Sequence, residues 1–80
     1  SGIKIDTEGE DLNVLLGAQN LIKIYRPKII IEIRNENKLK IQEFFNKFNY
    51  KLFDISNIQN NINLNDLNIK NVMNIFADPF

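Results

Sequence analysis

The segment Gly2-Ile3-Lys4-Ile5-Asp6-Thr7-Glu8-Gly9 is the starting point for predicting the fold. Apolar and polar residues alternate over residues 2–6, which is typical of a half-exposed strand. Gly9 then provides a turn, and from residue 11 onward apolar residues recur every three or four positions. We therefore predict a strand at 2–6 that is followed directly by a helix at 11–25.

The later elements alternate in the same way. The spacing predicts a strand at 28–34, a helix at 38–48, a strand at 50–55, a loop at 57–71 with one helical turn near 65–67, and a strand at 72–77. Strands that alternate with helices of this length indicate right-handed parallel crossovers, with both helices on one face of the sheet. The short last connection allows an antiparallel final strand. The expected fold is a single α/β domain over residues 1–80.

The composition excludes several classes of function. Ten basic and ten acidic residues cancel, so neither a nucleic acid nor a membrane is an expected partner. The chain has no cysteine, which excludes disulfides, thiolate nucleophiles and cysteine–histidine zinc sites within it. The longest apolar run, Ile29-Ile30-Ile31, is far shorter than the roughly 20 residues that span a bilayer, and no signal peptide is visible. We expect a soluble, cytoplasmic protein.

Two motifs, Lys4-Ile5-Asp6-Thr7-Glu8-Gly9 and Val14-Leu15-Leu16-Gly17-Ala18, lie on either side of Asp11. Together they resemble the K-I-D-x-E-G-x-E-x-x-V-L-x-G-A signature of FkbM-type methyltransferases, in which glutamate usually occupies the position of Asp11. The resemblance covers nearly the whole chain. It continues through Arg26-Pro27, Ile30-Ile31-Glu32-Ile33, Asn49-Tyr50 (with Asn in place of the family's Gly) and Asn74-Ile75-Phe76-Ala77.

The resemblance implies a Rossmann-like fold with strand order 3-2-1-4-5-7-6, and S-adenosylmethionine as the donor that methylates a hydroxyl of a small metabolite or sugar. On that map the chain is the C-terminal half of a methyltransferase domain, a four-stranded mostly parallel sheet of order 4-5-7-6 with two helices on one face. The glycine-rich cofactor loop belongs to the other half, and the three glycines here form no G-x-G motif. We therefore expect no cofactor-binding or metal-binding residues, and no activity from these residues alone.

The candidate site residues follow from this map, because ligands of open α/β sheets bind beyond the carboxyl ends of the strands. Asp6 is predicted to position the substrate or the methyl group, and Glu8 to accept the hydroxyl proton. The alternatives are a turn role for Asp6 and a helix-dipole role for Glu8. Glu32 and Arg34 are candidate substrate-binding residues, with an ion pair or solvent exposure as the favoured alternative. A cation held by Asp6, Glu8 and Asp11 is disfavoured because no second set of ligands is visible.

Two further interpretations compete with a methyltransferase. The chain is then either a non-catalytic dimerisation or binding module derived from the same fold, or an unrelated small α/β domain. The strand at 2–6 is expected to leave one edge bare, and the sheet face that carries Ile30 and Glu32 is expected to have no cover. We therefore predict a homodimer through an exposed strand edge or through this sheet face.

Overall fold

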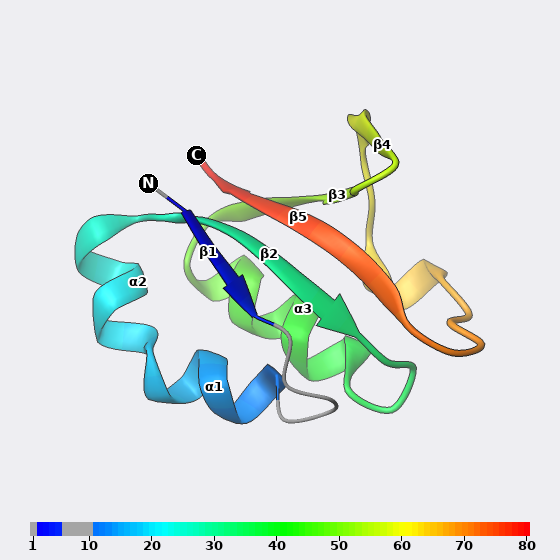
Figure 1. Ribbon diagram of the computed structural model, residues 1–80, viewed down its shortest axis with the longest axis horizontal. Coiled ribbons are helices and arrows are strands. Elements are labelled where there is room, and N and C mark those ends of the chain that lie inside the picture. Colours follow the sequence, from blue (N-terminus) through cyan, green and yellow to red (C-terminus); the bar gives the residue numbers. More distant parts are fainter. Residues whose placement is uncertain (1, 6–10) are drawn as a thin grey trace.

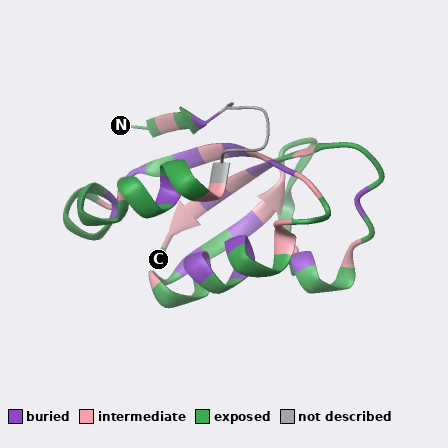
Figure 2. Ribbon diagram, turned by 90° about the horizontal axis from the view of Figure 1, so that it is seen from below, coloured by how far each residue is buried: buried purple, intermediate pink, exposed green. Residues whose placement is uncertain are grey.

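A computed structural model describes residues 2–5 and 11–80 and confirms the α/β class (Figure 1). The described helices α1, α2 and α3 lie together on one face of the sheet (Figures 1 and 2). In chain order the elements are β1 (Gly2–Ile5), α1 (Asp11–Gly17), α2 (Gln19–Tyr25), β2 (Lys28–Ile33), α3 (Lys38–Lys47), β3 (Tyr50–Asp54), β4 (Asn57–Asn61), the 3-10 helix η1 (Leu64–Asp66) and β5 (Met73–Pro79).

The described strands form one sheet with the order β1-β2-β5-β3-β4. The first four correspond to the predicted order 4-5-7-6, which is confirmed. The predicted four-stranded, mostly parallel sheet is wrong, because the described residues form five strands, and among these only β1 and β2 pair in parallel. β5 runs against β2 and β3 and lies between them, so this one reversed strand produces two antiparallel pairings. The β3–β4 hairpin adds the third.

The predicted loop at 57–71 is wrong over its first part, where Asn57–Asn61 form β4, while the helical turn is confirmed as η1 within one residue. The carboxylate of Asp54 closes the turn before β4. Its Oδ1 accepts hydrogen bonds from the backbone nitrogen and the hydroxyl of Ser56, at 2.9 and 2.7 Å. These bonds hold the pKa of Asp54 below its usual range.

The predicted helix at 11–25 is two shorter helices, with Ala18 between α1 and α2. Leu15 of α1 and Ile22 of α2 are fully buried against the sheet, so each helix contributes one central side chain to the core. The predicted helix at 38–48 is confirmed as α3. Asn49, just beyond it, has a φ of 61°, the left-handed conformation in which asparagine often ends a helix.

The core lies between the helices and one face of the sheet. It contains Ile5, Leu15, Ile22, Ile29, Ile31, Ile33, Ile41, Phe44, Phe45, Tyr50, Leu52, Leu64, Ile69, Ile75 and Ala77. On the other face, Ile30 and Phe76 lie opposite one another, and the rings of Phe76 and Phe53 are 6.0 Å apart. In the described part of the chain no helix covers this second face (Figure 2).

Candidate functional site

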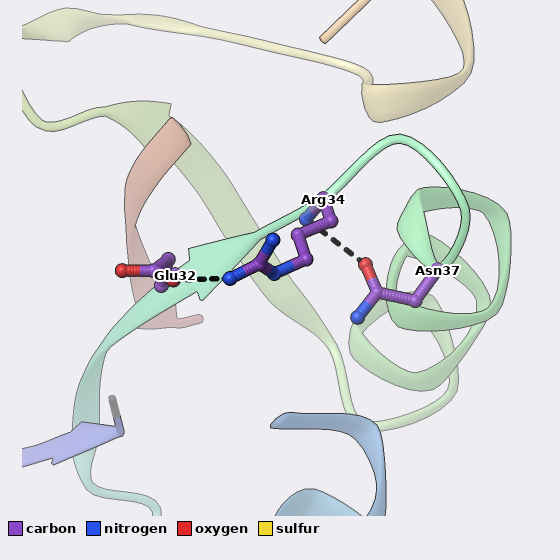
Figure 3. Close-up of polar contacts among 3 residues, drawn as sticks. All are labelled: Glu32, Arg34 and Asn37. Carbon is purple, nitrogen blue, oxygen red and sulfur yellow. Dashed lines mark hydrogen bonds and ion pairs between the residues drawn. The ribbon is translucent and has the colours of Figure 1, made fainter. Parts of the chain in front are cut away.

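The carboxyl ends of β1 and β2 lie side by side at one edge of the sheet. The two strands are parallel and aligned from Gly2 opposite Lys28 to Ile5 opposite Ile31. Glu32 belongs to β2, and Arg34 is the first residue after β2 ends at Ile33. Figure 3 shows the Arg34 side chain directed back along the strand toward Glu32. The structure thus brings the two predicted substrate-binding residues together at the edge where the sequence places them.

Arg34 and Glu32 form a loose ion pair. Nη2 of Arg34 is 3.7 Å from Oε1 of Glu32, and the two side chains are 35% and 17% exposed. Partly exposed pairs of this kind contribute at most about 1 kcal/mol. The Nε of Arg34 is buried and has no hydrogen-bond partner among the described residues. The ion pair that sequence reasoning favoured is therefore present, and the guanidinium has more N–H donors than this single contact uses.

The turn after β2 orients this pair. The backbone nitrogen of Arg34 donates to Oδ1 of Asn37 at 3.1 Å (Figure 3). Asn37 is also the N-cap residue, directly before α3, although its side chain makes no capping hydrogen bond to the helix. The amide of Asn37 thus ties the end of β2 to the start of α3, and it holds the backbone from which the Arg34 side chain extends.

The predicted catalytic residues Asp6 and Glu8 lie outside the described residues, so their roles remain predictions. Within residues 2–5 and 11–80 no cluster of histidine, cysteine, aspartate and glutamate could hold a metal ion. The described part of the site therefore consists of one carboxylate and one guanidinium beside the carboxyl end of β1.

Two polar side chains near Arg34, which sequence reasoning did not identify, anchor the segment that precedes β5. Oδ1 of Asn35 accepts a hydrogen bond from the backbone nitrogen of Ile69 at 2.9 Å. Nζ of Lys38 donates to the carbonyl oxygen of Leu67. Because Asn35 directly follows Arg34, these contacts hold the connection to β5 next to the candidate site.

Gln42 anchors the same segment from within α3, and it is the one buried polar side chain found in the described residues. Its Oε1 accepts a hydrogen bond from the backbone nitrogen of Leu64 at 2.7 Å, and its Nε2 donates to Oδ1 of Asn46 at 2.9 Å. The sequence carried a signal for this role, because Gln42 directly follows Ile41 on the inward side of an amphipathic helix. A polar residue at such a position requires internal partners.

A pocket of about 420 Å³ opens at the other end of the strands, where β2 and β3 begin, near Lys23, Arg26 and Lys47. Nη2 of Arg26 donates to the carbonyl oxygens of Asn49 and Phe80 at 3.1 and 3.2 Å. The three cations surround the carboxyl ends of α2 and α3, where unpaired carbonyl groups favour positive charge. We therefore assign these residues a structural role and keep the candidate site at Glu32 and Arg34.

The sheet is mixed, with the antiparallel strand β5 between β2 and β3, and the helices α1, α2 and α3 lie on one of its faces. This arrangement is compatible with a methyltransferase-like α/β domain. The family model of the methyltransferase FkbM domain matches residues 2–72, and the chain belongs to this family. Comparisons with curated proteins and with solved structures found no match. None of the helices in the described residues is long and apolar enough to cross a membrane.

Proposed function

We propose that this FkbM domain provides the acceptor-substrate side of an S-adenosylmethionine-dependent O-methyltransferase that acts on a hydroxyl of a small metabolite or sugar. Membership of the family is the observation that carries the proposal. The parallel, adjacent β1 and β2 support it, because their carboxyl ends define the edge at which such sheets bind ligands. The cysteine-free composition fits a cytoplasmic location, which we propose as well.

In this proposal Glu8 accepts the proton of the substrate hydroxyl, and Asp6 orients the reacting groups. A carboxylate can do both, because it accepts hydrogen bonds from a hydroxyl and binds its proton as the oxygen becomes nucleophilic. Arg34 contacts the substrate through the donors that its ion pair leaves free, and Glu32 holds the guanidinium in place while accepting substrate hydrogen bonds.

S-adenosylmethionine would supply the methyl group, but the residues of this chain do not fit the cofactor. The only glycines are Gly2, Gly9 and Gly17, and no two of them form a G-x-G loop. We therefore assign cofactor binding to a glycine-rich unit distinct from these 80 residues, and we propose that the chain alone transfers no methyl group. Isothermal titration of the isolated chain with S-adenosylmethionine should show no binding, and a saturable signal would contradict this division of roles.

The decisive experiment measures transfer of a labelled methyl group by a protein that joins this domain to its cofactor-binding unit, with hydroxyl-bearing metabolites and sugars as acceptors. Glu8→Gln should lower kcat by about 10²–10⁴-fold, since the general base is lost. Asp6→Asn and Arg34→Met should raise KM, and Arg34→Lys should restore part of the loss. Glu43→Gln, on the exposed surface of α3, is the matched control and should leave both constants unchanged.

Absence of methyl transfer to every hydroxyl acceptor would contradict the proposed reaction. If Glu8→Gln keeps full activity, Glu8 is not the general base, but the proposed methyl transfer would still hold. The alternative function is a non-catalytic binding or dimerisation module, and it predicts a protein that binds partners but never consumes S-adenosylmethionine.

A further inference from the structure

Asn74 lies beside the candidate site, on the strand next to β2. The strands β2 and β5 are antiparallel, and their register places Asn74 directly opposite Glu32. Ile31 and Ile33 are buried in the core, so Glu32 between them faces the other side of the sheet. Asn74 is exposed and precedes the buried Ile75, which places it on the same outer side. Because the Cβ atoms of such opposed residues are about 4.5–5.5 Å apart, the Asn74 amide and the Glu32 carboxylate are neighbours.

The backbone of Asn74 is fixed on both sides. β5 is the central strand of the described sheet and pairs with β2 on one side and with β3 on the other. The carbonyl oxygen of Asn74 accepts a hydrogen bond from the backbone nitrogen of Ile55 at 3.3 Å. The segment that leads into β5 is held as well, because Asn35 accepts a hydrogen bond from Ile69. Within residues 2–5 and 11–80 the side-chain amide of Asn74 makes no hydrogen bond, so its donor and acceptor are both unused there.

Asparagine is an unfavourable residue for this strand position. It favours turns and is depleted in strands, where side chains branched at Cβ pack better. Among the described strands that pair on both sides, β2, β3 and β5, Asn74 is the one asparagine. Residues that conflict with their local structure occur mainly at functional sites, where function outweighs the cost in stability. This conflict, at the position opposite Glu32, distinguishes Asn74 from the exposed asparagines of loops and of the edge strand β4.

We infer that Asn74 is a further substrate-binding residue, and that Glu32, Arg34 and Asn74 together select an acceptor with two adjacent hydroxyl groups, as in a sugar ring. This inference rests on the proposed function and names the class of acceptor within it. A carboxylate accepts hydrogen bonds, a guanidinium donates them, and an amide does both. One hydroxyl group donates to Glu32 and accepts from Arg34, while the adjacent hydroxyl group bonds to the amide of Asn74. An acceptor with a single hydroxyl group leaves part of this set without a partner, and a site built in this way discriminates against it.

The next residues on the same face match the rest of such an acceptor. Ile30 lies opposite Phe76, and each is two positions away along its strand from Glu32 or Asn74. Both of these apolar side chains are half-buried. Ligand sites combine apolar surface with a few placed polar groups, and a sugar ring presents C–H groups next to its hydroxyl groups. The polar pair and the apolar pair therefore fit one ring.

The test uses the protein that joins this domain to its cofactor-binding unit. Isothermal titration measures the binding of pyranosides and of their monodeoxy analogues, with vicinal cyclohexanediol and cyclohexanol as the smallest matched pair. The unmodified protein should bind each compound with adjacent hydroxyl groups at least about tenfold more tightly than its single-hydroxyl analogue. Asn74→Val removes the amide and should reduce this preference about five- to tenfold. Asn74→Gln keeps an amide and should restore part of it.

Stability separates this role from a purely structural one. Asn74→Val should raise the urea midpoint of unfolding, because valine suits a strand better, while the preference for adjacent hydroxyl groups falls. A purely structural asparagine would not lose ligand preference in a more stable variant. Asn61→Val makes the same change at an exposed position of β4 and should leave the preference as it is in the unmodified protein.

Titration requires no methyl transfer, so the inference and the proposed reaction can fail separately. The inference would be overturned by equal binding of both kinds of compound, by no binding of either, by a preference that Asn74→Val retains, or by its equal loss in Asn61→Val. Any of these results together with methyl transfer would leave the proposed reaction standing. A preference that Asn74→Val removes, in a protein that transfers no methyl group, would support the binding site and contradict the reaction.

Discussion

The guanidinium of Arg26 lies over the ring of Tyr50, 5.0 Å from its centroid. Both residues lie next to Pro27, which separates α2 from β2. The hydroxyl of Tyr50 donates to the carbonyl oxygen of Pro27 at 2.6 Å. Arg26 itself has a φ of 49°, the left-handed conformation that side chains disfavour. The contacts of its guanidinium therefore hold a strained backbone at the start of β2.

Replacing Arg26 should separate the effect of its guanidinium contacts on stability from the effect of its strained backbone. Arg26→Ala loses the ring contact and the hydrogen bonds to three carbonyl groups, and we expect a loss of about 2 kcal/mol in the free energy of unfolding. Arg26→Gly loses the same contacts but relieves the strained φ, so it should be more stable than the alanine variant by about 1 kcal/mol. Urea unfolding measures both values. Equal stabilities for the two variants would show that the backbone strain is negligible.

Tyr50 should make stability depend on pH in the alkaline range. Burial raises the pKa of its phenol, the nearby Asp78 also raises it, and Arg26 opposes them. Because the pKa is higher in the folded chain than in the unfolded chain, the contribution is complete below about pH 10 and is lost as the pH rises through the folded pKa. Tyr50→Phe should remove this dependence and cost about 1 kcal/mol for the missing hydrogen bond.

Chemical unfolding at a series of pH values measures this effect. Tyr25→Phe is the matched control, since Tyr25 is 70% exposed and its replacement should change stability little. An alkaline loss of stability that persists unchanged in Tyr50→Phe would assign the effect to another group.

Gly17 offers a simple stabilising change. It is the last residue of α1, and a Cβ atom built there meets nothing within 4 Å apart from its chain neighbours and the backbone of its own helix. Gly17→Ala should therefore stabilise the chain by about 0.5–1 kcal/mol, because alanine loses less backbone entropy on folding. Gly2→Ala is the contrasting variant, since its Cβ would lie 3.2 Å from the carbonyl oxygen of Lys28. Thermal unfolding should show a gain for Gly17→Ala alone, and a loss there would reveal a conformation that requires glycine.

Local patterns in the sequence predicted the α/β class and the helix α3, whereas the order of four strands was implied by the family resemblance. The alternation before Asp6 and the apolar spacing of Ile41, Phe44 and Phe45 are such patterns, because periodicity reports which face of an element is buried. The family resemblance placed Glu32 and Arg34 at the carboxyl end of a strand, and the structure brings them within 3.7 Å. The roles of Asp6 and Glu8 stay predictions.

Only the tertiary structure decided the features that depend on partners distant in sequence. Residues 57–61 become a strand because β3 provides backbone hydrogen bonds, whereas their mixture of Asn and Ile specifies no conformation strongly. The antiparallel character of the sheet follows from the insertion of β5 between β2 and β3. Gln42 and Asn35 gain their roles from backbone groups 22 and 34 residues away. Pairing and polar anchoring join separate segments, so local periodicity cannot report them.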